Sequence, residues 1–516
     1  MAKVKPVVKI FGIACVLGVC YMGFQYAKNN GYLNNIVPAK KNTVTNVDKS
    51  ILNEMREKTT LKKPITVGVV TWGGYAGGQY FNKGFQASEN SRYWKDYNIL
   101  VQFKVIDDYN TSREAWKSGD VDVLWTTADS FPCESGSLKD YDPVIIFQSD
   151  WSRGGDAIVV RQGIDTINDL KGKKIAVAFG TPSHTFLIWL LNTAGISYND
   201  VTIVSVPSAI DAATTYKAQK VDAAVVWSPD DMDCVKNVIG TKILKNTKDT
   251  NIIADVFYVK REFLNSHQKE LKALIEGWMI GASEINTNSV AKQEATKILS
   301  LGLNQPESFC ENAINNVRLT TIGDNKNFFN VNGDYTGVKG EDLYTKMGQI
   351  YESPEIGLAK NVPAWRNVVD TSIIKEIVLS GHGNEAEGVK KYTAPTKTEA
   401  TAKAIATKQV TITFASNSSV LDGNAKYIIN KEFVDIARAC GSRIRIEGNT
   451  DSQGSSAMNK QLSLKRAQAV VNYLVSIGFD VNRFVVVGNG SDKPVADNNT
   501  EDGRSKNRRT DFELID

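Results

Sequence analysis

Short apolar runs alternate with longer helical segments along residues 63–378. Runs such as ITVGVV, VDVLWTT and KKIAVAF have the length and the β-branched content of buried strands. Between them, segments such as HTFLIWLLNTAG and QKELKALIEGWMIGASEINT are long enough to form helices. This alternation predicts an α/β domain with a mostly parallel sheet, and its length suits two lobes.

A second pattern occupies residues 409–516. The runs VTITF, RIRIEG, RFVVVGNG and RTDFELI predict strands, and helices are expected near 421–439 and 457–477. Together they predict a compact α+β domain. Residues 379–408 are rich in Thr, Ala, Lys and Gly and contain hardly any large apolar residue, which predicts a flexible linker.

The first 27 residues differ from the rest of the chain. Lys3, Lys5 and Lys9 precede an uncharged apolar run from Ile10 to Phe24. Small residues are poorly placed for cleavage after this run, so we expect an uncleaved signal anchor, a transmembrane helix within residues 1–27. The lysines predict that the chain beyond it lies outside the cytoplasm, where polar residues 28–62 would form a stalk.

Composition adds few constraints to this picture. The net charge of +4 over 516 residues is too small to predict a nucleic-acid partner. The three histidines are far apart and no CxxC pair occurs, so we expect neither a metal site nor a cofactor. Four cysteines lie beyond the apolar run, and the sequence does not determine any disulfide pairing among them: Cys133, Cys234, Cys310 and Cys440.

Two strand ends in the α/β region carry polar groups. The segment DLKGKKIAVAFGTPSHTF leads from a strand into a helix start, and KVDAAVVWSPD ends a strand at Trp227. Together with VDVLWTTADS and ADVFYVKREF, this order and spacing resembles the nitrate, sulfonate and taurine type of solute-binding proteins of ABC importers. The resemblance implies a two-lobed periplasmic-binding-protein fold of type II, with the second lobe at about 156–254. It also implies a small-molecule solute between the lobes and an ABC permease as a partner.

The ends of parallel strands are where such sheets bind ligands, which gives a set of candidate cleft residues. Asp129 and Asp230 disfavour an anion, whereas the helix start near Thr181 favours one, so the ligand class stays open. We find no nucleophile elbow and no Ser/His/Asp spacing, and therefore expect no enzyme activity. The candidates are Trp72, Gly73, Tyr75, Thr126, Thr127, Asp129, Thr181, Ser183, His184, Trp227 and Asp230.

The C-terminal segment GNTDSQGSSAMNKQLSLKRAQAVV, followed by GNGSDKPVADNNTEDGRSKNRR, resembles the OmpA-like peptidoglycan-binding domain over 409–516. The resemblance implies that Asp451 and Arg466 bind the free end of diaminopimelate in the peptidoglycan stem peptide. That end carries an ammonium and a carboxylate, so an anion beside a bidentate cation suits it. Thr450, Asn459 and Ser463 are expected beside this pair.

The expected protein is therefore a solute-binding protein anchored in the inner membrane by one span, exposed to the periplasm and tethered to peptidoglycan. It would capture a small polar ligand for an ABC-type importer or for sensing. With a cleaved signal it would lie free in the periplasm. The alternative is a structural cell-envelope linker, or a stator-like subunit, with a non-binding α/β domain. Stator subunits carry protons on a carboxylate in the span, and residues 7–26 contain no Asp or Glu.

Overall fold

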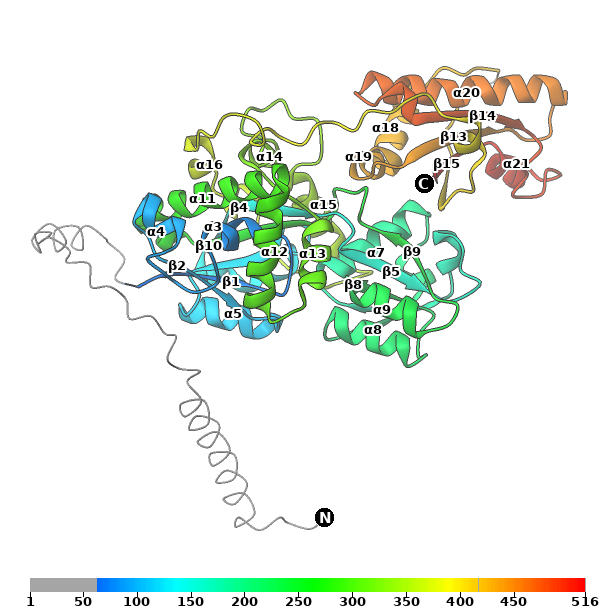
Figure 1. Ribbon diagram of the computed structural model, residues 1–516. Coiled ribbons are helices and arrows are strands. Elements are labelled where there is room, and N and C mark those ends of the chain that lie inside the picture. Colours follow the sequence, from blue (N-terminus) through cyan, green and yellow to red (C-terminus); the bar gives the residue numbers. More distant parts are fainter. Residues whose placement is uncertain (1–62, 416, 516) are drawn as a thin grey trace, which may run out of the picture. The chain divides into compact units, whose positions relative to one another are not determined.

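The computed structural model describes residues 63–415 and 417–515 (Figure 1). The predicted signal anchor at 1–27 and the predicted stalk at 28–62 lie outside these residues. Within the described part of the chain, no helix combines the length and the apolar character that a membrane crossing requires.

A six-stranded sheet forms the centre of residues 63–152 and 254–378. Its strands β1, β2 and β3 run parallel, and β4, β10 and β11 join them in antiparallel pairs. All five residues of β1 are buried, so neither face of this strand reaches water. In order across the sheet the strands are β11 (Val317–Leu319), β4 (Pro143–Ser152), β10 (Ala254–Lys260), β3 (Val123–Thr127), β1 (Ile65–Val69) and β2 (Val101–Val105).

A five-stranded sheet forms the centre of residues 156–246. β6 pairs in parallel with β7 and β8, and β5 pairs antiparallel with β8 and β9. In order across the sheet the strands are β7 (Thr202–Val206), β6 (Lys174–Ala178), β8 (Ala223–Trp227), β5 (Asp156–Val160) and β9 (Lys242–Asn246).

The expectation of a mostly parallel sheet is wrong, because both sheets are mixed. The chain crosses between the sheets twice, from β4 into β5 and from β9 into β10. A strand that enters a sheet by such a crossing lacks the helical connection that makes neighbouring strands parallel, and it pairs antiparallel instead. The two crossings join the two sheets through segments 153–155 and 247–253.

Helices pack on both sheets (Figure 1). Two of them, α3 and α11, approach closely because Gly77 faces Gly281, where a Cβ at Gly281 would collide with the Gly77 carbonyl oxygen. With the first sheet lie α3 (Ala76–Phe81), α4 (Arg92–Tyr97), α5 (Tyr109–Ser118), α6 (Pro132–Leu138), α10 (Arg261–Ser266), α11 (Gln268–Thr287), α12 (Ser289–Leu303), α13 (Glu307–Asn315), α14 (Ile322–Phe328), α15 (Gly340–Glu352) and α16 (Ser372–Glu376). With the second lie α7 (Pro182–Thr193), α8 (Ala209–Lys217) and α9 (Asp230–Asn237).

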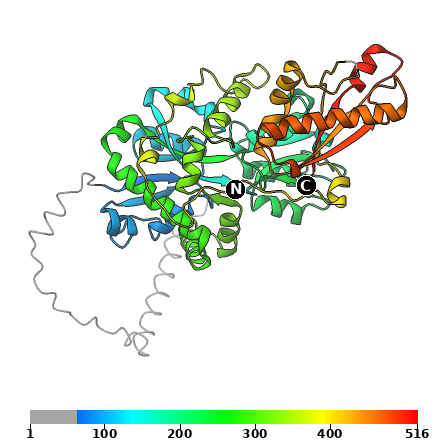
Figure 2. The same ribbon diagram turned by 90° about the horizontal axis from the view of Figure 1, so that it is seen from above.

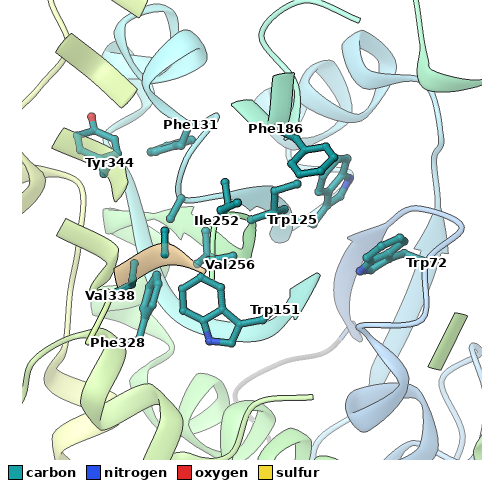
Figure 3. Packing of buried hydrophobic residues seen from close by; sticks show 14 of the residues in the cluster. Trp72, Trp125, Phe131, Trp151, Phe186, Ile252, Val256, Phe328, Val338 and Tyr344 are labelled. Atoms are coloured by element: carbon teal, nitrogen blue, oxygen red, sulfur yellow. The ribbon is translucent and has the colours of Figure 1, made fainter. Parts of the chain in front are cut away.

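Aromatic side chains fill the core of the first sheet. Phe147 of β4 stacks on Phe257 of β10 with ring centroids 5.0 Å apart, and Trp278 of α11 contacts both. On the other face Trp151 meets Phe328 edge to face at 5.7 Å (Figure 3). Such contacts exclude water from the strands that carry the candidate site.

The C-terminal domain is a four-stranded sheet with helices packed on it. The strand order is β12 (Ala406–Val410), β15 (Thr510–Ile515), β13 (Arg443–Asn449) and β14 (Phe484–Gly490). The long helix α20 (Ser456–Ser476) lies along β13 and β14, as its orange ribbon shows in Figures 1 and 2. The remaining helices are α17 (Lys397–Thr401), α18 (Gly423–Ile429), α19 (Asp435–Ala439) and α21 (Glu501–Asn507).

The predicted linker at 379–408 differs from the structure at its end. α17 and the start of β12 lie inside that range, and β12 precedes the run VTITF that was expected to form the strand. The reason is that β12 buries Lys408, whose ammonium donates to the Glu432 carbonyl at 2.9 Å. A strand that buries a lysine through its aliphatic stem lacks the apolar alternation by which strands are recognised.

Candidate functional site

A small cavity of about 20 Å³ lies where residues of both α/β sheets meet. Three of the predicted cleft residues line it: Trp72, Tyr75 and Trp227. The other lining residues are Val70, Trp125, Asp156, Pro182, Ile253 and Asp255. Asp156 and Trp227 lie in strands of the second sheet, and Trp125 and Asp255 lie in strands of the first, so any relative movement of the sheets changes this cavity.

Aromatic rings form much of the wall. Trp72 follows β1 and Trp227 ends β8, and their ring centroids lie 6.5 Å apart with the planes tilted by 55°. The crossing segment passes so close that a Cβ at Gly155 would collide with the Trp72 ring. Trp125 of β3 adds a third indole, labelled with Trp72 in Figure 3.

Buried carboxylates complete the wall. Asp156 Oδ2 accepts a hydrogen bond from Ser152 at 2.9 Å, whereas its Oδ1 is buried and has no hydrogen-bond partner among the described residues. Asp255 Oδ1 accepts from the Tyr75 hydroxyl at 2.8 Å. Behind them, Asp150 accepts from Trp72 Nε1 at 3.2 Å. The cavity therefore places an oxygen of Asp156 without a donor next to indole rings.

Burial sets the electrostatics of these groups. Desolvation raises the pKa of Asp156 to about 7; the hydrogen bond from Ser152 and the nearby Trp227 indole partly offset this rise, and Asp129 adds to it. Desolvation and the nearby Asp150 raise the pKa of Asp255 well above its usual range. In the described part of the chain, neither Asp156 nor Asp255 has a lysine or arginine nitrogen within 4.0 Å. The buried Arg113 forms its ion pair with Glu134, at 2.7 Å.

Four predicted cleft residues near the first sheet do not line the cavity. Thr126 donates to Glu134 at 2.6 Å, and Thr127 shares a 2.6 Å hydrogen bond with Ser130. Gly73 packs against the backbone of Ala313, where a Cβ would collide. The fourth, Asp129, is buried behind the wall, with a long 3.4 Å hydrogen bond from the amide of Ala254.

The predicted helix-start residues also lie outside the cavity lining. Thr181 donates to the Ala178 carbonyl at 2.8 Å, and Ser183 is buried with an unpartnered hydroxyl. His184 shares a 2.8 Å hydrogen bond with Tyr198, and burial lowers its pKa to about 4. Asp230 opens α9, where burial raises its pKa. Among the residues at the start of α7, Pro182 lines the cavity, whereas Thr181, Ser183 and His184 do not.

The sequence analysis missed Asp156, Asp255 and Trp125. Asp156 begins the run DAIVV and Asp255 is the second residue of ADVFYV, both predicted as strands. An acidic residue inside an apolar strand is almost never buried without a reason, so each was a usable signal. The sequence could not show that Asp156 and Asp255 lie close together, because their proximity depends on how β5 and β10 follow the two crossings between the sheets.

The C-terminal site is built around the turn after β13. Asp451 Oδ2 accepts from Arg508 Nη1 at 2.7 Å, and its Oδ1 accepts from the Gln453 amide at 3.0 Å. Arg466 makes no ion pair within 4.0 Å in the described residues. Its Nε donates to the Ser418 carbonyl at 3.0 Å. Asp451 therefore forms its ion pair with Arg508, and Arg466 is near enough for Asp451 to act on its pKa.

Burial lowers the pKa of Arg466, a shift that Asp451 partly offsets and Arg508 reinforces. The guanidinium also lies 4.9 Å from the Phe414 ring centroid. Partial burial without a carboxylate partner leaves this cation under-compensated, so it favours a carboxylate from outside the chain.

The three predicted neighbours of Asp451 and Arg466 differ in their hydrogen bonds. Asn459 donates to the carbonyls of Asp451 and Gln453 at 3.3 and 2.9 Å and so holds the turn. Thr450 is buried with an unpartnered hydroxyl. Ser463 is fully buried and its hydroxyl accepts from the Gly490 amide at 2.9 Å, so this side chain holds the end of β14.

Family models match both regions. Residues 84–288 match the model described as NMT1/THI5 like, and residues 413–508 match the OmpA family. The chain carries an NMT1/THI5-like region and an OmpA region. The two resemblances drawn from the sequence are therefore confirmed.

Curated relatives align with parts of the chain. Outer membrane protein A of Bordetella avium is 48% identical over 68 residues, 13% of this chain and 35% of that protein. Peptidoglycan-binding protein ArfA of Mycobacterium tuberculosis is 42% identical over 89 residues, 17% of this chain and 27% of that protein. The outer-membrane lipoprotein YfiB of Pseudomonas aeruginosa is 38% identical over 104 residues, 19% of this chain and 62% of that protein. The chain thus spans less than two thirds of each of these relatives.

Solved structures are similar at low sequence identity. The aliphatic sulphonate binding protein SsuA of Escherichia coli has 15% identity and a TM-score of 0.47, covering 65% of this chain and 98% of that one. The nitrate-binding protein NrtA of Synechocystis has 15% identity and a TM-score of 0.40, covering 58% of this chain and 92% of that one.

No metal or disulfide site occurs in the part of the chain that the structure describes. No group of three or more His, Cys, Asp or Glu side chains there could hold a metal ion. Cys133, Cys234, Cys310 and Cys440 are all free thiols. The candidate chemistry therefore rests on the two sites described above.

Proposed function

We propose that this protein is a solute-binding protein tethered to peptidoglycan. The periplasmic-binding-protein-like region, of type II, captures a small polar solute between its sheets. The OmpA region holds the diaminopimelate end of a stem peptide. Residues 1–27 anchor the chain in the inner membrane, and the captured solute is delivered to an ABC permease or sensed through closure of the two sheets.

The cavity shared by the two sheets is the observation that carries this proposal. It is small, residues of both sheets line it, and one of them is Asp156, whose Oδ1 the fold leaves without a partner among the described residues. A purely structural domain gains nothing from such an atom, because an unsatisfied buried polar group is destabilising. A ligand that bridges the sheets supplies the missing contact.

The proposed peptidoglycan site follows from the charges at the turn after β13. Asp451 provides an anion for the ammonium of diaminopimelate, and Arg466 provides a planar fork for its carboxylate. Arg508 holds Asp451 from the other side at 2.7 Å. The names of the OmpA-region relatives support this assignment, since ArfA is a peptidoglycan-binding protein.

Tethering raises the effective concentration of the solute-binding region at one place in the envelope. A freely diffusing binding protein samples the whole compartment, whereas this one stays within reach of a membrane partner. The arrangement suits delivery or reporting at a fixed location.

Two measurements on the full-length protein test the proposal. The first is co-sedimentation with sacculi whose stem peptides carry diaminopimelate, compared with sacculi that carry lysine at that position. Lysine lacks the side-chain carboxylate, so we expect strong retention only on the first kind; equal retention on both contradicts the assignment of Arg466. The second is native mass spectrometry of the purified protein, where a bound small molecule that is lost on denaturation is expected. Its absence, together with no stabilisation by any added solute, would favour the structural-linker alternative.

The membrane anchor has its own test. Amino-terminal sequencing of the protein extracted from membranes is expected to begin at or next to Met1. A mature start close to Lys28 would show that the signal is removed and that the protein lies free in the periplasm.

A further inference from the structure

Most of the residues that line the cavity carry an aromatic ring or a carboxyl group. Trp72, Trp125 and Trp227 present indole rings, and Tyr75 adds a phenol. The faces of aromatic rings carry the negative part of a quadrupole and attract cations. The two tryptophans from different sheets, Trp72 and Trp227, lie 6.5 Å apart and tilted, so a small group can contact both rings.

Two carboxyl groups lie among these rings. Asp156 is 2% exposed and lines the cavity, and its Oδ1 has no donor among the described residues. Asp255 is 4% exposed, lines the same cavity and receives one hydrogen bond, from Tyr75. A charged donor from outside the chain would satisfy Asp156 and form a charge-assisted hydrogen bond.

Two of the donors at the cavity are already used, whereas Trp125 Nε1 is buried without a partner among the described residues. Trp72 Nε1 donates to Asp150, and the Tyr75 hydroxyl donates to Asp255. No lysine or arginine lines the cavity. The start of α7 contributes Pro182, which has no N–H, and the amides of His184 and Thr185 donate to the Thr181 carbonyl. An anion in this cavity would lie against Asp156 and Asp255 with no lysine or arginine to compensate its charge.

We propose that the solute is a small organic cation whose primary ammonium head sits between Trp72 and Trp227 and donates to Asp156 and Asp255. This inference rests on the proposed solute-binding function and specifies the charge of its ligand. The cavity volume of about 20 Å³ is close to the space of one water molecule, which suits an ammonium head and is too small for a tetramethylammonium group. It also distinguishes this site from those of SsuA and NrtA, whose names specify a sulphonate and nitrate.

Isothermal titration of the full-length protein at constant ionic strength tests the sign of the ligand's charge. The probes are methylammonium, ethylammonium and tetramethylammonium chloride, sodium methanesulfonate and sodium nitrate, with potassium chloride as the salt control. We expect saturable binding of the two primary ammonium ions, weaker binding of tetramethylammonium by about tenfold or more, and none for the anions or potassium.

Variants connect the binding to the cavity. Asp156→Asn keeps the shape and removes the charge, and should weaken methylammonium binding by about tenfold or more. Asp255→Asn should act in the same direction. Asp140→Asn, an exposed acid far from the lining residues in the sequence, serves as the matched control and should bind like the wild type. Melting temperatures of all three variants verify that they are folded.

Each remaining outcome overturns the inference. Saturable binding of methanesulfonate or nitrate without methylammonium binding would reverse the charge of the ligand and leave solute capture intact. Methylammonium binding that Asp156→Asn and Asp255→Asn both leave unchanged would move the site elsewhere. If no probe of either charge binds at millimolar concentration, the cation assignment is wrong. Native mass spectrometry of the purified protein then decides separately whether the region captures any solute.

Discussion

Asp451 accepts a 2.7 Å hydrogen bond from Arg508, while Arg466, the expected partner, lies beside the pair and donates to the Ser418 carbonyl. The proposed peptidoglycan site therefore contains two arginines with different roles. Arg508 orients the carboxylate of Asp451, and Arg466 keeps a guanidinium without a carboxylate within 4.0 Å in the described residues. A zwitterionic ligand fits this division, with its ammonium on Asp451 and its carboxylate on Arg466.

The first prediction concerns Arg466. Arg466→Lys keeps the positive charge but loses the planar fork, so we expect retention on diaminopimelate sacculi to fall by about tenfold or more. The melting temperature should change little, because Arg466 makes a single hydrogen bond to the protein. Co-sedimentation measures the effect, and Arg438→Lys, an exposed arginine of the same domain, is the control. Retention equal to that of the control would remove Arg466 from the site.

The second prediction concerns Arg508. Its side chain is 38% exposed and pairs with both Asp451 and Glu501 at 2.7 Å. Exposed ion pairs contribute below about 1 kcal/mol, so Arg508→Gln should leave the stability of the domain almost unchanged. Sacculus binding should weaken less than in Arg466→Lys, because Asp451 keeps its charge but loses its orientation. A larger loss than in Arg466→Lys would show that Arg508 itself contacts the stem peptide.

The third prediction concerns Arg483, a buried arginine that supports the C-terminal domain. Its guanidinium donates to the carbonyls of Ser442, Ala437 and Cys440 at 2.9, 2.8 and 2.7 Å. Arg483→Leu leaves these acceptors unsatisfied, which should destabilise the domain by about 2–4 kcal/mol. Hydrogen exchange should show lost protection in β13 and β14 and unchanged protection in β1 and β3. Full protection in β13 and β14 would contradict the structural role of these three hydrogen bonds.

The fourth prediction concerns pH. Burial raises the pKa of Asp129, Asp150 and Asp156 to about 7, from an ordinary value of 3.8. Between these values the folded protein holds protons that the unfolded chain releases, so stability falls as the pH rises. His184, with a pKa lowered from 6.5 to about 4, acts in the opposite direction. Three carboxyls outweigh one imidazole, so the ligand-free melting temperature should fall between pH 5 and about 7.5.

Tryptophan fluorescence reports the unfolding of residues 63–378 without that of the C-terminal domain, because all nine tryptophans lie within this range. Asp156→Asn should make the fall shallower, and Asp140→Asn should leave it as in the wild type. A melting temperature that rises over this range would mean that the carboxyls are not buried in solution. The groups that face or adjoin Asp156 and shape its titration are Ser152, Thr247, Trp227, Asp129, Asp150 and Asp255.

Much of the secondary structure follows from the sequence alone. The apolar run at 268–287 predicts α11 to the residue, and ITVGVV, DAIVV and RIRIEG coincide with β1, β5 and β13 within one residue. These elements are set by the spacing of apolar side chains a few residues apart, which the sequence displays directly. β12 shows the limit of this rule, because burial of the Lys408 stem hides the pattern.

The amino-acid sequence alone was enough to predict the order of most elements and the two family resemblances, and to propose Asp451 and Arg466 as a peptidoglycan site. Only the tertiary structure placed Arg508 on Asp451 and brought Asp156 and Asp255 into one cavity with Trp72 and Trp227. The reason is physical. Local patterning depends on neighbours in the chain, whereas these contacts depend on two crossings between sheets and on the packing of α21 against the β13 turn, which join residues far apart in sequence.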